Sequence, residues 1–207
     1  MLSRIEGMEE ERSMRRVGVF CGSSNGASPV FREAGRALGS LLARQGLAVV
    51  YGGGRVGVMG AVAEGALAER GRVYGVIPEV LEIKERAHPG LTELRLVKTM
   101  HERKALMAEL SDAFVALPGG MGTLDEFCEI VTWAQLGLHQ KPCGLLDVGG
   151  YFRSFVAFID TAVAQGFVKA EHRSFIQVAS DPEELVAKLR AFKPTLEEPR
   201  WIGPEQT

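Results

Sequence analysis

The sequence predicts an α/β fold of the Rossmann-like, doubly wound type: a mostly parallel sheet of about seven strands with helices on both faces. Short apolar segments run almost without interruption, which is typical of strands covered on both faces in a parallel sheet. Longer segments with helical patterns separate them, so repeated strand–helix units with right-handed crossovers are expected. Glycine-rich segments follow three of the expected strands, at the sheet edge where such folds bind ligands.

Each element can be placed on the chain. The expected strands are Val17–Gly22, Ala48–Tyr51, Val73–Ile77, Leu94–Val97, Ala113–Leu117, Cys143–Leu146 and Phe175–Val178. Two helices should begin at Ser28-Pro29 and Asp181-Pro182, where a polar cap precedes a proline at the first helical position. The other expected helices are Gly57–Arg70, Met100–Leu110, Thr123–Leu136 and Tyr151–Gln165.

Composition limits the class of protein. A chain of 207 residues with 46% hydrophobic and 24% charged residues fits one domain, expected over residues 16–193, with a flexible extension over 1–15 and a tail over 194–207. The net charge of −2 does not suit a general nucleic-acid binder. Three scattered cysteines and four separated histidines favour neither a metal site nor a disulfide framework, and no cofactor is expected. The sequence shows no secretory signal and no membrane span, which favours the cytoplasm.

The glycine-rich segment Pro118–Glu126 joins an expected strand to an expected helix. Glycines let backbone N–H groups approach a ligand, and a helix N-terminus carries partial positive charge, so the segment suits a phosphate. Thr123 could add a hydroxyl donor. Thr123 and Glu126 also have the spacing of a capping box, with Thr123 as the N-cap. Glu126 is therefore either a cap partner or a carboxylate at the mouth of the site, and the two roles are compatible.

The preceding helix carries a second candidate, Arg103. Its helical face also holds the apolar residues Leu106, Met107 and Leu110, so the guanidinium is expected at the inner edge of an apolar stripe. Such a charge requires a partner. The spacing leaves open whether that partner is a carboxylate in a structural ion pair or a phosphate or hydroxyl of a substrate. Lys104 alone has the character of a solvated surface charge.

Other motifs are less specific. The segment Gly52–Gly57 matches GxGxxG, but it lies in the second strand–helix unit, whereas a dinucleotide fingerprint normally occupies the first. An NAD-linked oxidoreductase remains an alternative, although these glycines would equally allow close packing. The segment Gly22–Ser24 is either a polar binding turn or a nucleophile site, although no histidine lies in a recognisable triad context. Cys128 is expected in the core, and His101 and His139 in structural or surface positions.

The two motifs Met100–Lys104 and Pro118–Glu126, in this order and spacing, resemble the signature of the Lonely Guy (LOG) family. Members of that family are phosphoribohydrolases that act on cytokinin riboside 5′-monophosphates. The family was long labelled as lysine decarboxylases, but no lysine near the motifs has the character of a Schiff-base lysine. The resemblance spans about Arg16 to Phe192 and includes Cys21–Ser24, Tyr51–Gly54, Thr132–Gly137 and Lys141-Pro142.

The resemblance implies roles for matched positions. Arg103 and Glu126 would be the catalytic pair. The substrate-binding residues would be Glu85, Arg103, Lys104, Gly119, Gly120, Met121, Gly122, Thr123, Leu124, Asp125, Glu126 and Thr132, with Gly22, Ser23, Gly53, Gly54 and Met100 as additional candidates. Glu85 follows Ile83-Lys84, where many relatives have Pro-Arg, so its match is less close. Short members of the family are typically homodimers.

The implied reaction is hydrolysis of the N-glycosidic bond of a nucleoside 5′-monophosphate, either AMP or an N6-modified AMP, to a free base and ribose 5-phosphate. Glycosyl transfer passes through an oxocarbenium-like state that the Glu126 carboxylate could stabilise while it positions or deprotonates water. Arg103 would orient the substrate. A non-catalytic nucleotide-binding or carrier protein is the alternative, because the same fold supports both.

Overall fold

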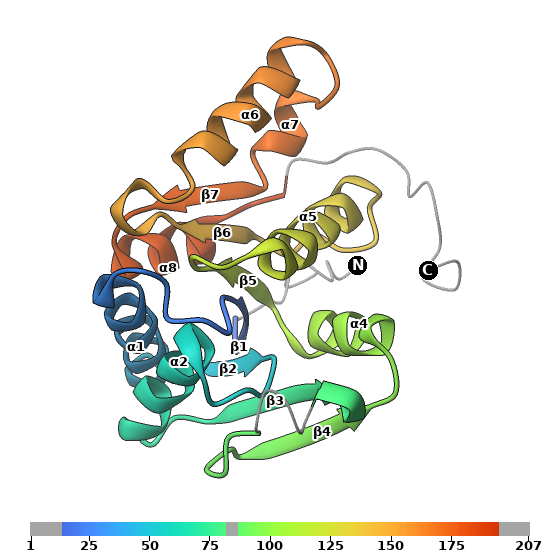
Figure 1. Cartoon of the computed structure of the whole chain (residues 1–207). Helices are drawn as coiled ribbons and strands as arrows, with labels where there is room; N and C mark the ends of the chain where they lie inside the picture. Colours follow the sequence, from blue (N-terminus) through green and yellow to red (C-terminus); the bar gives the residue numbers. More distant parts are fainter. Residues whose placement is uncertain (1–13, 82–86, 195–207) are drawn as a thin grey trace, which may run out of the picture.

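A computed structural model describes residues 14–81 and 87–194, and one parallel sheet of seven strands organises them (Figure 1). The strand order is β4-β3-β2-β1-β5-β6-β7, and every neighbouring pair is parallel. The strands are β1 (Arg16–Phe20), β2 (Ala48–Tyr51), β3 (Val73–Pro78), β4 (Glu93–Val97), β5 (Ala113–Ala116), β6 (Cys143–Leu146) and β7 (Ile176–Ala179). The predicted doubly wound fold is confirmed.

The strand order reverses between β1 and β5. From β1 the chain adds strands outward to β4, then returns to β5 on the other side of β1. Such a switch point opens a crevice at the carboxyl ends of the strands. The structure therefore brings the loops after β1 and β5 together.

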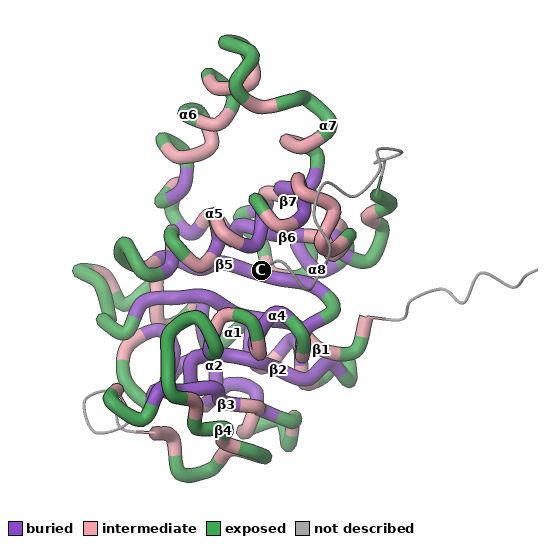
Figure 2. The backbone as a smooth tube through the Cα atoms, turned by 90° about the vertical axis from the view of Figure 1, so that its right-hand side faces the viewer, coloured by how far each residue is buried: buried purple, intermediate pink, exposed green. Residues whose placement is uncertain are grey.

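Helices cover both faces of the sheet (Figure 1). They are α1 (Pro29–Arg44), α2 (Gly57–Ala68), α4 (Met100–Leu110), α5 (Met121–Gln135), α6 (Arg153–Ala164), α7 (Ala170–Arg173) and α8 (Pro182–Ala191), with a short 3₁₀ helix at Val148–Gly150. One core cluster joins the sheet to α1, α2 and α8, and a second joins it to α4 and α5. Figure 2 shows the central strands buried between these layers. The short helix α7 was not predicted.

Two predicted helix caps are confirmed. The Ser28 side chain accepts a hydrogen bond from the Val30 N–H at 3.4 Å, and the Asp181 carboxylate accepts one from the Glu184 N–H at 2.9 Å. In each case a proline follows at the start of the helix, as predicted.

Two other local predictions are wrong. Helix α5 begins at Met121 with Gly120 as its N-cap, so Thr123 lies inside the first turn and forms no capping box with Glu126. The Thr123 side chain is instead buried against Gly119, because tertiary packing of the loop outweighs the local capping preference. Cys128 was expected in the core, but it lies on an exposed face of α5.

Some expectations concern residues at the margins of the described chain. The proposed extension over 1–15 and tail over 194–207 lie almost entirely outside the described residues, and Glu85 lies outside them as well. In the described ranges no helix has both the length and the apolar composition that a membrane span requires.

Candidate functional site

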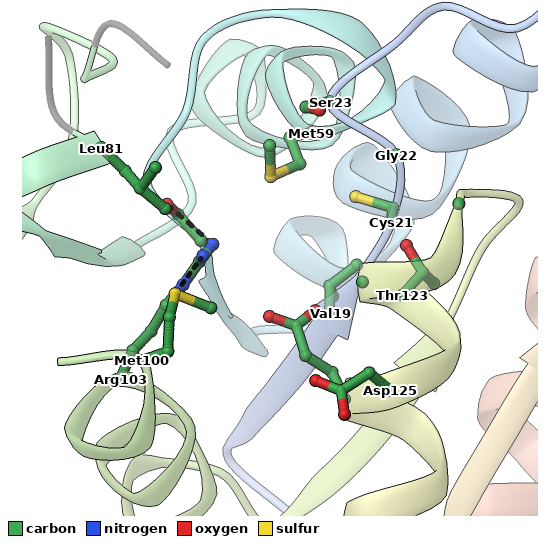
Figure 3. Close-up of a pocket in the computed structure, with 14 residues that line it drawn as sticks. Val19, Cys21, Gly22, Ser23, Met59, Leu81, Met100, Arg103, Thr123 and Asp125 are labelled. Carbon is green, nitrogen blue, oxygen red and sulfur yellow. Dashed lines mark hydrogen bonds between the residues drawn. The ribbon is translucent and has the colours of Figure 1, made fainter. Parts of the chain in front are cut away.

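A cavity of about 250 Å³ opens at the switch point of the sheet (Figure 3). Segments at the ends of β1, β2, β3 and β5 and the first turn of α4 surround it. Its lining residues are Val19, Cys21, Gly22, Ser23, Gly52, Met59, Leu81, Met100, Arg103, Gly120, Gly122, Thr123, Asp125 and Glu126. The position agrees with the general rule for ligand sites in doubly wound folds.

Arg103 enters the cavity from α4. Thr99 caps this helix by accepting a hydrogen bond from the Glu102 N–H at 3.1 Å, which places Arg103 in the first turn. The Arg103 side chain is 5% exposed, and its Nη2 donates to the Gly52 carbonyl at 3.3 Å. In Figure 3 the guanidinium lies on the opposite side of the cavity from Thr123 and Asp125. The prediction of a buried arginine on an apolar helix face is confirmed.

Gly52 is a site residue that the sequence analysis did not single out. A Cβ at this position would lie 1.9 Å from Arg103 Nη2. Any side chain at residue 52 would therefore displace the guanidinium. The triple glycine Gly52–Gly54 was a visible signal, and Gly53 and Gly54 were named as additional candidates, but nothing in the sequence linked Gly52 to Arg103.

Glu126 lines the same cavity from α5. Its charge and that of Arg103 both act on the buried thiol of Cys21, at the end of β1. Burial raises the pKa of Cys21, the Glu126 carboxylate raises it further, and Arg103 lowers it. The thiol is consequently neutral, and the two predicted catalytic charges share one small volume around it.

The N-terminus of α5 opens into the cavity. The N–H groups in the first turn of a helix have no intrahelical acceptor, and Gly120 as N-cap supplies no side-chain oxygen. Gly120 and Gly122 line the cavity, and a Cβ on either would meet no atom within 4 Å, so no neighbouring group fills the space beside them. Unoccupied donors and the positive end of the helix dipole together form an anion site.

The N-terminus of α2 is arranged differently. Its Val58 and Met59 N–H groups donate to the carbonyls of Ser24 and Gly22 at 3.3 and 3.2 Å. Gly57 has φ +66°, and a Cβ there would lie 2.3 Å from the Ser23 backbone. The GxGxxG segment thus packs against the loop after β1, and these donors are not available to a pyrophosphate. The NAD-linked alternative loses its structural basis.

Lys104 follows Arg103 but is not one of the residues that line the cavity. Its Nζ donates to Asp125 Oδ2 at 3.3 Å and to Glu129 at 3.0 Å, which ties α4 to α5. Burial would lower the pKa of Lys104, but the hydrogen bonds and charges of Glu129 and Asp125 outweigh it and raise that pKa. Thr132 is exposed farther along α5, and its hydroxyl donates to the Cys128 carbonyl at 2.7 Å.

The structure brings together most, but not all, of the predicted site residues. Those outside the cavity lining are Gly53, Gly54, Lys104, Gly119, Met121, Leu124 and Thr132. The lining residues that sequence reasoning missed are Val19, Cys21, Gly52, Met59 and Leu81. Apolar members of this second set look like core residues in a sequence. Among the described residues, no cluster of His, Cys, Asp and Glu is placed to hold a metal ion.

Comparisons with known proteins find a matching family and relatives that cover most of the chain. Residues 59–189 match the family model described as "Possible lysine decarboxylase". The chain is 48% identical over 193 residues to the cytokinin riboside 5′-monophosphate phosphoribohydrolase LOG7 of Arabidopsis thaliana, covering 92% of this chain and 88% of that protein. It is 49% identical over 176 residues to the phosphoribohydrolase of the same name from Rhodococcoides fascians, covering 84% of this chain and 89% of that protein.

Among solved structures, the molybdenum cofactor carrier protein of Chlamydomonas reinhardtii superposes with a TM-score of 0.65 at 22% identity, over 84% of this chain and 94% of that one. That level of identity supports the shared fold alone. The sequence relatives carry the closer assignment, because their similarity extends over most of the chain at nearly half identity. The chain belongs to the LOG family of cytokinin riboside 5′-monophosphate phosphoribohydrolases.

Proposed function

We propose that this protein hydrolyses the N-glycosidic bond of AMP or an N6-modified AMP, releasing the free base and ribose 5-phosphate. One observation carries the proposal: a carboxylate, an arginine and an open helix N-terminus converge on a single cavity of about 250 Å³. The names of the relatives support the substrate class.

In the proposed mechanism, the 5′-phosphate binds at the N-terminus of α5 and fixes the ribose. Glu126 lies beside C1′, where its charge stabilises the oxocarbenium-like transition state and its oxygen accepts a proton from the attacking water. The water oxygen bonds to C1′ as the C1′–N bond breaks, and the base leaves with the electron pair and takes up a proton from solvent, while Glu126 returns the proton it accepted to solvent. Arg103 orients the ribose or phosphate through its planar fork.

We propose that the predicted site residues that do not line the cavity support the residues that do. Lys104 joins α4, which carries Arg103, to α5, which carries Glu126.

A homodimer is also proposed. Helix α6 has no fully buried residue, and Phe158 on it is 68% exposed, so this helix has apolar surface available to a second copy of the chain. Light scattering at micromolar concentration should give twice the mass of one chain.

The decisive experiment is a panel of nucleoside 5′-monophosphates, including AMP and isopentenyladenosine monophosphate, scored for free base by chromatography. Adenosine serves as the matched control without phosphate. Release of base from a monophosphate but not from adenosine is expected, because remote phosphate binding orients the reacting bond. Tight binding of a monophosphate with no release of base would instead indicate a carrier protein.

A further inference from the structure

Tyr151 makes a hydrogen bond to the glycine loop from outside the cavity. Its Oη donates to the Gly119 carbonyl at 2.5 Å, across 32 positions of the chain. We propose that Tyr151 is a positioning residue that fixes the Gly119–Gly120 peptide and thereby directs the Gly120 N–H toward the substrate phosphate. This inference rests on the proposed function, in which the phosphate binds at the N-terminus of α5.

The loop needs such a contact because its peptide joins two glycines. Gly119 cannot carry a side chain, since a Cβ there would lie 2.1 Å from Thr123 Oγ1 and 2.7 Å from the Gly22 nitrogen. Glycine fits this space, but it also allows backbone orientations that other residues disfavour. Packing therefore requires glycine at residue 119, and its rotational freedom must be limited by another group.

The geometry of the peptide links Tyr151 to the cavity. In a planar trans peptide the carbonyl and the following N–H point in opposite directions, and the described chain has no cis bond. When Tyr151 holds the Gly119 oxygen, the Gly120 N–H points away from the phenol. Gly120 lines the cavity and Gly119 does not, so the opposite side of this peptide is the ligand side.

The position of Tyr151 is set independently of this hydrogen bond. Gly149 and Gly150, with φ +63° and +77°, form the turn that precedes it. The Asp147 carboxylate then accepts a hydrogen bond from the Phe152 N–H at 2.6 Å. The tyrosine ring meets Phe152 and Phe31 edge-on, with centroids 5.1 and 5.8 Å away. These two ring contacts thus orient the hydroxyl toward the loop, while 46% of Tyr151 remains exposed.

The experiment uses Tyr151→Phe in the full chain, which removes the hydroxyl and keeps every ring contact. The dissociation constant of ribose 5-phosphate, measured by calorimetry, should rise about three- to tenfold, the change expected for one neutral hydrogen bond. The KM for AMP should rise by the same factor, with kcat within about twofold. Amide hydrogen exchange over residues 119–121, measured without ligand, should become faster.

Tyr74→Phe is the matched control, because Tyr74 lies on β3 with its ring against the Arg16 guanidinium and not at the cavity. It should leave both the dissociation constant and the exchange rates unchanged. Unchanged ribose 5-phosphate binding and unchanged exchange in Tyr151→Phe would overturn the positioning role. If the wild-type protein bound neither ribose 5-phosphate nor inorganic phosphate, the proposed function would fail, and the exchange rates would still show whether Tyr151 fixes the Gly119–Gly120 peptide.

Discussion

The guanidinium of Arg103 occupies the space that a side chain at Gly52 would need. Its Nη2 lies 3.3 Å from the Gly52 carbonyl oxygen, and a Cβ on Gly52 would come within 1.9 Å of that same nitrogen. Because Gly52, directly after β2, has no side chain, it leaves the space that the guanidinium of Arg103 from α4 occupies. The hydrogen bond to the Gly52 carbonyl, directly after β2, also helps to orient one edge of the guanidinium.

Replacement of Gly52 by alanine should consequently impair Arg103 without changing that residue itself. The added methyl group forces the guanidinium out of place, and a displacement of about 1 Å in a positioning group can cost about a hundredfold in rate. We expect kcat/KM for AMP to fall by about that factor. The measurement is steady-state release of base.

Gly90→Ala is the control for this variant, because a Cβ there would meet its nearest neighbour at 3.4 Å, an ordinary contact. It should retain wild-type turnover. Full activity in Gly52→Ala would show that the position of the Arg103 guanidinium is unimportant for the reaction.

A substitution of Lys104 can distinguish a structural role from a substrate-binding role. Its ammonium group joins Asp125 and Glu129, and its side chain is only 11% exposed. Lys104→Met should leave two carboxylates without that cation and lower the free energy of unfolding by about 1 kcal/mol, measured by urea denaturation. The KM for AMP should change by less than about threefold if no contact with substrate is lost.

A rise of more than tenfold in that KM, with normal stability, would instead assign Lys104 to the substrate. Lys98→Met is the matched control, because Lys98 is an exposed lysine shortly before the same helix. It should alter neither quantity.

His139 should make stability depend on pH below neutrality. Burial lowers the pKa of His139 to about 4, partly offset by its hydrogen bond to the Ile130 carbonyl, while the charge of Lys141 lowers it further. The Lys141 N–H donates to Nδ1 at 3.1 Å, and a proton on Nδ1 would break that bond. The folded state therefore favours the neutral ring.

The direction of this pH dependence follows from the difference between the pKa values of His139 in the folded and unfolded states. With a folded pKa below the unfolded value, the contribution of His139 is complete above about pH 6.5 and is lost as the pH falls toward 4. The loss can approach 1.4 kcal/mol per pH unit in that window. Urea denaturation between pH 7 and 4 should show a shallower pH dependence in His139→Gln than in wild type. Parallel curves for the two proteins would contradict the assignment.

The sequence was sufficient for the features that depend on local interactions. The Ser28 and Asp181 caps, each followed by proline, predicted helix starts that the structure contains. The apolar strands and the position of Arg103 on an apolar helix face were equally accessible, because period and composition are read within one element.

The features that failed depend on contacts between distant segments. The spacing of Thr123 and Glu126 fits the sequence pattern of a capping box. In the structure, however, Thr123 packs against Gly119 and α5 already begins at Met121. Gly52 and Arg103 are 51 positions apart, and Tyr151 and Gly119 are 32 apart. No periodicity or motif spacing encodes such pairs, so the supporting contacts of the site could be found only in the structure.

The last prediction concerns Glu126, for which the structure excludes the alternative role of a capping-box partner. Because α5 begins at Met121, Glu126 does not form the capping box, and Glu126→Gln should not weaken the helix start. The amide keeps the size of the side chain but loses the charge that the proposed mechanism places beside C1′. We expect kcat for AMP to fall about a hundredfold or more, with a thermal midpoint close to that of wild type. Glu109→Gln, an exposed substitution on α4, is the control and should leave both unchanged. Near wild-type turnover in folded Glu126→Gln would refute the catalytic assignment and favour a nucleotide-binding protein that performs no hydrolysis.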